Sequence, residues 1–297
     1  MTKIVECIPN FSEGRCDKTI GLLIKTARST PGVSLLDVNR DPSHNRTVLT
    51  LMGDPAGIKS AAIALAKCAR DNIDLTRQTV QHPRMGAVDV IPFVPIKGVT
   101  MQDCIAISKE VGRTIADELG IPVFLYEEAA SGEHRRNLAD IRKGQFEGLA
   151  AKMQSPQWQP DYGSAAPHPT AGAVAIGARK PLIAFNANLS TSDITIADKI
   201  AKKVRGSSGG LKYCKAIGIM LKERNIAQVS MNLVDYENTP VYAALELIKM
   251  EAARYGVRVI GTELIGLAPA EALIDCAEYY LQIENFDCRQ HVLENHI

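Results

Sequence analysis

Apolar residues follow two different periods along the chain, and these periods predict short strands that alternate with helices. The N-terminal half is predicted to run in the order strand 4–8, helix 17–29, strand 33–38, strand 47–52, helix 54–70 and strand 87–94. The polar stretch N-R-D-P-S-H-N-R separates the second and third strands and is typical of a turn. The order of elements is therefore β-α-β-β-α-β.

The C-terminal half repeats this plan. Its predicted order is strand 182–185, helix 194–204, strand 216–221, strand 227–233, helix 240–255 and strand 257–260. The same N-x-S triplet follows the first strand of each half, as Asn10-Phe11-Ser12 and as Asn188-Leu189-Ser190. We therefore predict an α+β fold built by internal duplication from two ferredoxin-like (βαββαβ) subdomains, residues 1–178 and 179–297. Extra helices are predicted at 100–119 and 269–281.

The segment between the halves, residues 131–177, has a different character. It is rich in Pro and Gly, includes S-P-Q-W-Q-P-D-Y-G and A-A-P-H-P-T-A-G, and holds the only tryptophan, Trp158. A loop of this length is uncommon in a compact domain unless it is functional or a linker. The segment is thus a candidate to line a ligand site between the halves.

Composition narrows the range of partners. The chain has 297 residues, of which 46% are hydrophobic and 23% charged, and its formal net charge is +1. Such a balance gives no long-range attraction to nucleic acid or to an anionic membrane, and we expect neither as a partner. Any anionic ligand must therefore be held by a local cluster of donors.

Targeting and redox signals point to a cytoplasmic protein. No stretch approaches the roughly 20 apolar residues that a membrane span requires, and the start M-T-K-I-V-E-C-I-P-N-F does not resemble a signal peptide. The seven cysteines are odd in number, scattered, and never spaced C-x-x-C. This usage favours a reducing compartment over a disulfide framework or a zinc site.

Several common catalytic signatures are missing from the sequence. The six histidines form no H-x-x-x-H pair, and no acid or cysteine completes a metal-ligand spacing, so no metal is expected. The sequence has neither a G-x-S-x-G elbow nor a Rossmann G-x-G-x-x-G. The stretch G-S-S-G-G-L-K departs from the phosphate-loop pattern and precedes a strand, which is typical of a plain connection.

One histidine lies in unusual surroundings. His82 opens the stretch H-P-R-M-G, where Pro83 favours an extended conformation at His82 and fixes its own φ, and Gly86 permits a close approach of another chain segment. An imidazole with a pKa near 6.5 on a stiff loop suits a general base at neutral pH. Arg84 could hold a carboxylate through a bidentate contact. The alternative is an exposed loop in which the histidine has no role.

Other histidines and arginines have simpler interpretations. His44 lies in the predicted turn, where turn chemistry explains its neighbours. His168 lies between two prolines. We interpret His44 and His168 as surface histidines. Arg46 and the pair Arg135-Arg136 could grip anions, although a solvated surface is the default for such side chains.

Long motifs across the chain resemble those of glutamate formimidoyltransferases, the folate-dependent enzymes of histidine breakdown. In the N-terminal half they are V-E-C-I-P-N-F-S-E-G, S-H-N-R-T-V, H-P-R-M-G-A-V-D-V-I-P-F-V-P and G-V-T-M. In the C-terminal half they are G-A-R-K-P-L-I-A-F-N, N-I-A-Q-V-S-M-N-L and E-L-I-G-L-A-P-A-E-A-L. The resemblance covers almost the whole chain, and an ordered set of this kind is far more specific than any one motif.

The resemblance implies two ferredoxin-like subdomains that flank a folate cleft, usually in a homodimer. It implies transfer of a formimidoyl group between N-formimidoyl-L-glutamate and tetrahydrofolate, with tetrahydrofolate as cosubstrate and no metal. His82 corresponds to the family's proton acceptor. The family's folate-contacting segment falls on Gly163, Ser164, Ala165, Ala166, Pro167, His168, Pro169, Thr170, Ala171 and Gly172.

Three further residues are candidates for binding the substrate or folate. Arg84 and Arg46 adjoin matched motifs and could supply the basic lining that an anionic substrate needs, and Asn10 lies within the first motif. Some relatives carry an acid where this chain has Asn39, so another group would have to orient His82 here. In fused relatives a cyclodeaminase domain follows, and that activity is not expected from this chain.

Two other functions stay open at this point. A folate enzyme could take its one-carbon unit from 5-formyltetrahydrofolate or formylglutamate, which differ from the formimidoyl donor at one atom. A non-catalytic module that binds folate or an amino acid is the other alternative, although it gives no reason for His82 on its stiff loop.

Overall fold

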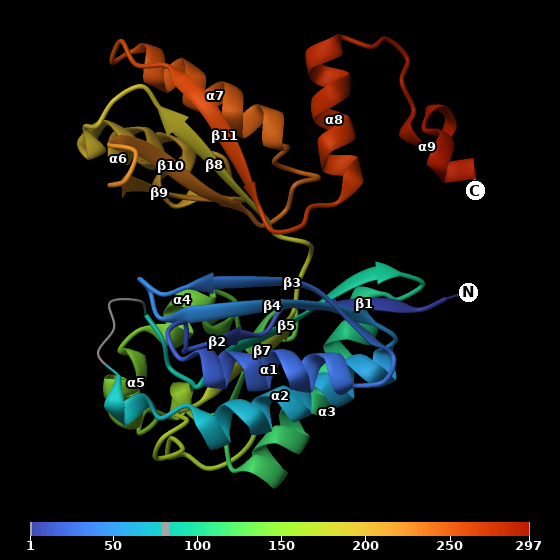
Figure 1. The fold of residues 1–297 in the computed structure, drawn as a ribbon, viewed down its shortest axis with the longest axis vertical. Coiled ribbons are helices and arrows are strands. Elements are labelled where there is room, and N and C mark those ends of the chain that lie inside the picture. Colours follow the sequence, from blue (N-terminus) through green and yellow to red (C-terminus); the bar gives the residue numbers. More distant parts are fainter. Residues whose placement is uncertain (1, 79–82, 297) are drawn as a thin grey trace. The chain divides into compact units, whose positions relative to one another are not determined.

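The chain divides into two compact units, Met1–Arg179 (unit 1) and Lys180–Ile297 (unit 2), in a computed structural model that describes residues 2–78 and 83–296 (Figure 1). Strand pairing within the described residues stays inside each unit, because β1 to β7 form one sheet and β8 to β11 form another. Helices and strands are mixed in both units. The predicted α+β class is confirmed.

Unit 1 is built on a seven-stranded sheet in which β3, β4, β1 with β2, β5, β7 and β6 are neighbours in that order. Its strands are β1 (Ile4–Cys7), β2 (Asn10–Phe11), β3 (Val33–Asp41), β4 (Arg46–Gly53), β5 (Val88–Lys97), β6 (Val123–Glu127) and β7 (Val174–Ala178). The pairs from β3 to β5 are antiparallel, whereas β5–β7 and β7–β6 are parallel. β6 and β7 extend the predicted four-stranded plan.

Three long helices of unit 1 are α1 (Asp17–Ser29), α2 (Pro55–Asn72) and α3 (Met101–Leu119). Local sequence sets their ends. Asp54 caps α2 by accepting two backbone N–H groups, and Thr100 forms a capping box with Asp103 at the start of α3. Gly120 ends α3 in the left-handed conformation at φ 66°. The predicted cap and end of this helix are confirmed.

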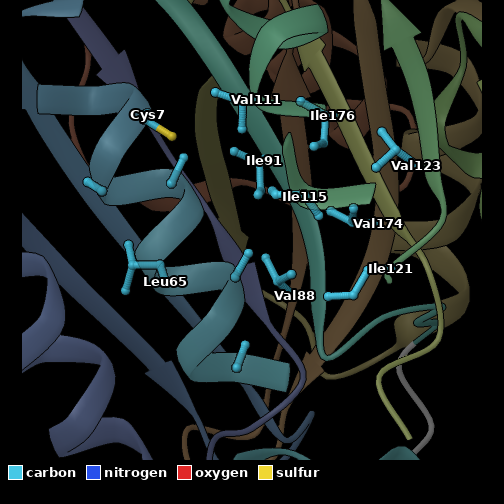
Figure 2. Close-up of a cluster of buried hydrophobic side chains, with 14 of the residues drawn as sticks. Cys7, Leu65, Val88, Ile91, Val111, Ile115, Ile121, Val123, Val174 and Ile176 are labelled. Carbon is cyan, nitrogen blue, oxygen red and sulfur yellow. The ribbon is translucent and has the colours of Figure 1, made fainter. Parts of the chain in front are cut away.

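The main core of unit 1 lies between these helices and the sheet. Figure 2 shows the side chains of α2 and α3 meeting those of the central strands, with Leu65 on one side and Val111 and Ile115 facing Ile91 and Ile176. These residues are buried. Removing their apolar surface from water stabilises the fold by about 25 cal/mol per Å² and is the main stabilising contribution. The helical and alternating periods seen in the sequence therefore mark the core.

The Pro- and Gly-rich segment is an integral part of unit 1 and has secondary structure of its own. It contains η2 (Glu133–Arg135), α4 (Leu138–Arg142), α5 (Gln145–Lys152) and η3 (Pro156–Trp158) before β7, whereas η1 (Leu75–Arg77) lies earlier in the chain. Ile141 of α4 and Leu149 of α5 join a second buried cluster with Val90, Phe124 and Ala175 of the sheet. The segment therefore covers the sheet face opposite to the long helices.

Unit 2 has a four-stranded antiparallel sheet in the order β11, β8, β10, β9. Its elements are β8 (Ile183–Leu189), α6 (Ile194–Val204), η4 (Gly206–Ser208), β9 (Cys214–Leu221), β10 (Ile226–Leu233), α7 (Val241–Ala253), β11 (Val259–Ile265), α8 (Ala270–Leu281), α9 (Cys288–His291) and η5 (Leu293–His296). A separate core joins the sheet to α6 and α7. The order from β8 to β11 is β-α-β-β-α-β, and the finer ferredoxin-like assignment stays a prediction.

The two units correspond residue by residue at their central hairpins. Asn45 and Asn225 both adopt φ 49°, and each donates its N–H to the carbonyl three residues earlier, at 3.4 and 3.3 Å. The next residues, Arg46 and Ile226, begin β4 and β10. Position 46 of unit 1 therefore corresponds to position 226 of unit 2.

The same correspondence holds beside the N-x-S triplets. Ser12 and Ser190 each donate a backbone N–H to the residue just before β5 or β11, at 2.9 and 2.8 Å. Asn10 pairs with Val90, and Asn188 pairs with Gly261. Asp89 and Ile260, which directly precede Val90 and Gly261, therefore correspond to each other.

In the described part of the chain, no helix is both long and apolar enough to cross a membrane.

Candidate functional site

A small, partly enclosed hollow lies in unit 1, where β2, the β3–β4 turn and the start of β5 meet. It is lined by Asn10, Phe11, Ser12, His44, Asn45, Arg46, Arg84 and Asp89. We call it the arginine pocket. Three candidates from the sequence, Asn10, Arg46 and Arg84, therefore share one site, although they lie up to 74 positions apart.

Hydrogen bonds join the two sequence motifs that form this pocket. The Ser12 hydroxyl donates to the carbonyl of Gly86 at 2.7 Å, and the Gln78 amide donates to the carbonyl of Ser12 at 2.7 Å. Ser12 is buried. The N-F-S triplet and the H-P-R-M-G stretch thus lie side by side at the edge of the pocket.

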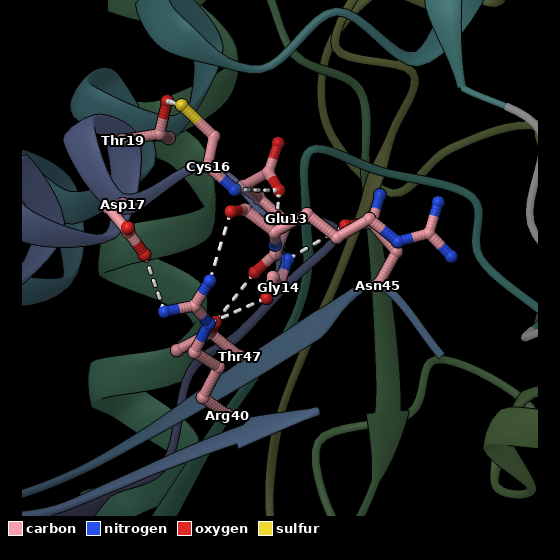
Figure 3. A network of polar contacts seen from close by, with 9 residues as sticks. Glu13, Gly14, Cys16, Asp17, Thr19, Arg40, Asn45 and Thr47 are labelled. Atoms are coloured by element: carbon pink, nitrogen blue, oxygen red, sulfur yellow. Dashed lines mark hydrogen bonds and ion pairs between the residues drawn. The ribbon is translucent and has the colours of Figure 1, made fainter. Parts of the chain in front are cut away.

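A polar network holds the turn that carries Arg46 (Figure 3). The Asn45 side chain accepts the N–H of Gly14 at 2.9 Å, and Arg40 donates to the Gly14 carbonyl at 2.7 Å and to Asp17 at 2.5 Å. A Cβ at Gly14 would lie 2.4 Å from the Asp41 carbonyl oxygen, so only glycine allows this approach. The network fixes the backbone directly before Arg46.

Arg46 is oriented by Asn10. The Arg46 Nε donates to Asn10 Oδ1 at 3.0 Å, the Nη2 donates to the same oxygen, and the Asn10 amide donates to the Ile8 carbonyl at 2.8 Å. Burial lowers the pKa of Arg46, as does the nearby charge of Arg142, while Asp89 opposes the shift. The half-buried Arg46 guanidinium still carries its charge at neutral pH, because an arginine pKa lies far above 7.

Arg84 is almost fully buried, with 4% of its side chain exposed. Its two terminal nitrogens donate to the Glu147 carboxylate at 3.0 and 3.3 Å, and one also donates to the Gln78 carbonyl at 3.2 Å. Its Nε is buried without a hydrogen-bond partner among the described residues. Glu147 has 62% of its side chain exposed, and Arg84 lowers its pKa. The Arg84 guanidinium thus already holds the carboxylate of an exposed side chain through a bidentate contact.

Sequence reasoning missed Asp89 and Arg142. Asp89 is 3% exposed, and its two carboxylate oxygens accept the Met85 N–H at 2.8 Å and the Arg142 Nη2 at 2.5 Å. The signal for Asp89 was an acid within an otherwise apolar strand, since a buried carboxylate requires a partner. No local signal pointed to Arg142, which lies 53 positions away.

The proton acceptor predicted from the resemblance, His82, lies outside the described residues. The end of its motif is attached to the end of the candidate folate segment. Ala87 donates its N–H to the Ala171 carbonyl at 2.9 Å, and Ala173 donates to the Met85 carbonyl at 3.0 Å. A Cβ at Gly86 would lie 2.0 Å from the Ala173 carbonyl oxygen, so this pairing requires glycine.

The candidate folate segment has an exposed half and a half tied into the fold. Residues 163–166 are exposed. In the second half, the His168 Nδ1 accepts the N–H groups of Thr170 and Ala171 at 3.3 and 3.1 Å, and His168 exchanges backbone hydrogen bonds with Gly172. Burial and the nearby Arg70 lower the pKa of His168. The His168 ring is therefore neutral at pH 7, and its hydrogen bonds stabilise the loop.

The other basic candidates have structural partners. The His44 ring lies 2.5 Å from the Asp41 carboxylate at the rim of the arginine pocket. Arg135 is buried, donates to Asp161 at 2.7 Å, and donates to two backbone carbonyls. Arg136 forms a surface ion pair with Glu128. Neither member of the Arg135-Arg136 pair lines the arginine pocket.

A second hollow surrounds Trp158. It is lined by His134, Asp140, Lys143, Gly144, Gly148, Lys152 and Trp158. The Lys152 ammonium lies 3.9 Å from the Trp158 ring centre and donates to three carbonyls at the end of α4, at 2.5, 2.6 and 3.2 Å. The three N–H donors of the Lys152 ammonium are therefore engaged by backbone carbonyls of the same segment.

Comparison with known proteins decides the family. Residues 4–179 match the formiminotransferase domain, N-terminal subdomain, and residues 184–295 match the formiminotransferase domain. The chain belongs to the formiminotransferase family. Unit 1 and unit 2 thus carry the two parts of this family's domain.

Curated relatives of the formiminotransferase family match over most of the chain. A glutamate formimidoyltransferase of Streptococcus pyogenes serotype M1 is 60% identical, over 100% of this chain and 99% of the relative. One from Thermoplasma acidophilum is 45% identical, over 96% of this chain and 94% of the relative. The formimidoyltransferase-cyclodeaminase of Gallus gallus is 44% identical over 96% of this chain, which spans 53% of that relative.

Proposed function

We propose that this protein is a glutamate formimidoyltransferase, which moves the formimidoyl group of N-formimidoyl-L-glutamate to tetrahydrofolate and yields 5-formimidoyltetrahydrofolate and L-glutamate. The observation that carries this conclusion is the match to a glutamate formimidoyltransferase at 60% identity over 99% of that relative. The reaction belongs to histidine breakdown and one-carbon metabolism.

The chemistry requires one proton to change place. The folate nitrogen attacks the formimidoyl carbon, a new C–N bond forms, and the bond from that carbon to the glutamate nitrogen breaks. The attacking nitrogen loses a proton and the leaving nitrogen gains one. A single histidine can serve as base and then as acid, and we assign this role to His82. Holding the two amines in position supplies much of the remaining acceleration.

The arginine pocket supports binding of an anionic substrate. Formimidoylglutamate carries two carboxylates, and the near-neutral chain must recruit it locally. Arg46 and Arg84 line one pocket, and Asn10 orients Arg46. Since Arg84 already holds the exposed Glu147 bidentately, a substrate carboxylate can replace Glu147 with little change in geometry.

Residues 163–172 would contact the folate, and the exposed half, 163–166, offers backbone that the fold has not covered. The subdomains would be residues 1–178 and 179–297. We further propose a cytoplasmic homodimer that requires no metal. The scattered cysteines support a reducing compartment. Among the described residues, no three or more His, Cys, Asp or Glu side chains are grouped as a metal site would require.

A comparison of donors tests the proposal. The protein is incubated with N-formimidoyl-L-glutamate, N-formyl-L-glutamate or 5-formyltetrahydrofolate (the last with L-glutamate as acceptor), and the folate absorbance is followed; tetrahydrofolate is present or absent with each glutamate donor. We expect turnover with the formimidoyl donor only when tetrahydrofolate is present. Faster turnover with a formyl donor would replace the proposed substrate. Binding without any turnover would favour a ligand-binding module.

A further inference from the structure

The least expected charge in the arginine pocket is that of Asp89. Taking a carboxylate out of water costs several kcal/mol, which its partners must offset. Asp89 is buried in β5, where its neighbours Val88 and Val90 are buried and apolar. A charge at this position therefore requires an explanation beyond packing.

Unit 2 shows that the fold does not require charges here. The positions that correspond to Arg46 and Asp89 are Ile226 and Ile260. Both units keep the same hairpin turn, the same N-x-S triplet and the same backbone hydrogen bond from its serine. Because the duplicated scaffold forms with two isoleucines, of which Ile260 is 51% exposed, the shared strand pairing does not itself require the arginine or the aspartate of unit 1.

Arg142 determines where the Asp89 carboxylate is engaged. One oxygen of Asp89 accepts the Met85 N–H, directly after Arg84, and the other accepts Arg142 Nη2. Arg142 ends α4, so the Pro- and Gly-rich segment, which lies outside the duplicated scaffold, supplies the cation that pairs with Asp89. Without Arg142, the buried carboxylate would be left with Arg46, on which its charge already acts, as a cation of the same pocket.

We propose that Asp89 and Arg142 are positioning residues for the substrate: Arg142 engages the Asp89 carboxylate, so that Asp89 braces the backbone beside Arg84 without capturing Arg46, whose charge serves the substrate carboxylate. The proposal rests on the proposed function. The lowered pKa of Arg46, to which burial contributes most and Arg142 next, agrees with two cations held close together.

A double-mutant cycle tests the proposal. The variants are Arg142→Met, Asp89→Asn and the double variant, and Kd for N-formimidoyl-L-glutamate is measured by calorimetry beside KM and kcat. In Arg142→Met the unpaired carboxylate competes with the substrate, and we expect Kd and KM to rise at least about fivefold, with a smaller change in kcat. Removing the carboxylate in the double variant should return Kd most of the way to the wild-type value.

Arg136→Met is the matched control, because Arg136 lies in the same segment and forms an exposed ion pair with Glu128. Its Kd should not change. If Arg142→Met does not fold, Arg142→Lys keeps the charge and is expected to bind within about twofold of wild type. The double variant, which leaves no unpaired carboxylate, is then expected to fold and to bind close to the wild-type value. An unchanged Kd in Arg142→Met, or no rescue in the double variant, overturns the proposal. Wild-type turnover in the donor comparison reports on the function separately.

Discussion

At the scale of single residues, the reaction depends on a base that is neutral before it accepts a proton. Histidine suits this task because its ordinary pKa, near 6.5, lies close to the working pH. His82→Ala is expected to reduce kcat by roughly 10²–10⁴-fold, with folding and folate binding retained. Steady-state assays of the wild type and the variant measure this loss.

His44→Ala is the control for this prediction. His44 also lines the arginine pocket, but its ring is engaged by Asp41 on the turn. Its kcat should therefore fall much less than that of His82→Ala. Equal losses in both variants, measured in steady-state assays, would remove the special role of His82.

The residues that line the arginine pocket were predictable only where the local sequence around them is unusual. Arg84 beside Pro83 and Arg46 in a polar turn stand out from their neighbours, and both line one pocket. Arg142 does not stand out, because a single arginine at the end of a short helix is ordinary on a surface. Its function depends on Asp89, and no local pattern links residues 53 positions apart.

At the scale of elements, the site depends on the close approach of two glycines. Gly86 and Gly172 pair as an isolated bridge, and a Cβ at either would lie 2.0 Å from a carbonyl oxygen. Gly86→Ala must therefore separate the H-P-R-M-G stretch from the candidate folate segment. We expect a loss of stability of about 3 kcal/mol in urea unfolding, together with weaker folate binding.

Gly21→Ala provides the comparison, because Gly21 lies in α1 and a Cβ there would meet nothing within 4 Å. Alanine favours a helix over glycine by up to about 1 kcal/mol, so this variant should be slightly more stable. Wild-type stability and folate affinity in Gly86→Ala would show that the two segments are not coupled.

The elements themselves were predictable where one face is apolar and the other polar. α1 spans the predicted residues 17–29, and the two β-α-β-β-α-β orders follow from the alternation of periods. β6 and β7 were missed because both are fully or almost fully buried short strands, which lack alternation. α4 and α5 were missed because helices of 5 and 8 residues give too few turns for a clear period.

At the scale of the whole molecule, two separate cores account for the two units. The buried cluster of unit 1 draws on β1 to β7 and the one in unit 2 on β8 to β11, and strand pairing within the described residues follows the same division. Duplication explains the common plan, while the segment with α4 and α5 is specific to unit 1. That segment supplies Arg142, the partner of a carboxylate that lies on the scaffold shared with unit 2.

Separate cores predict separate folding. Residues 1–179 and 180–297, expressed apart, each exceed the size at which a single hydrophobic core can sustain a domain. Each should therefore give a well-dispersed amide NMR spectrum and a cooperative urea transition. Leu233→Ala, which opens a cavity in the core of unit 2, should cost residues 180–297 about 2–5 kcal/mol. A disordered spectrum for either part would mean that its core is completed by the other.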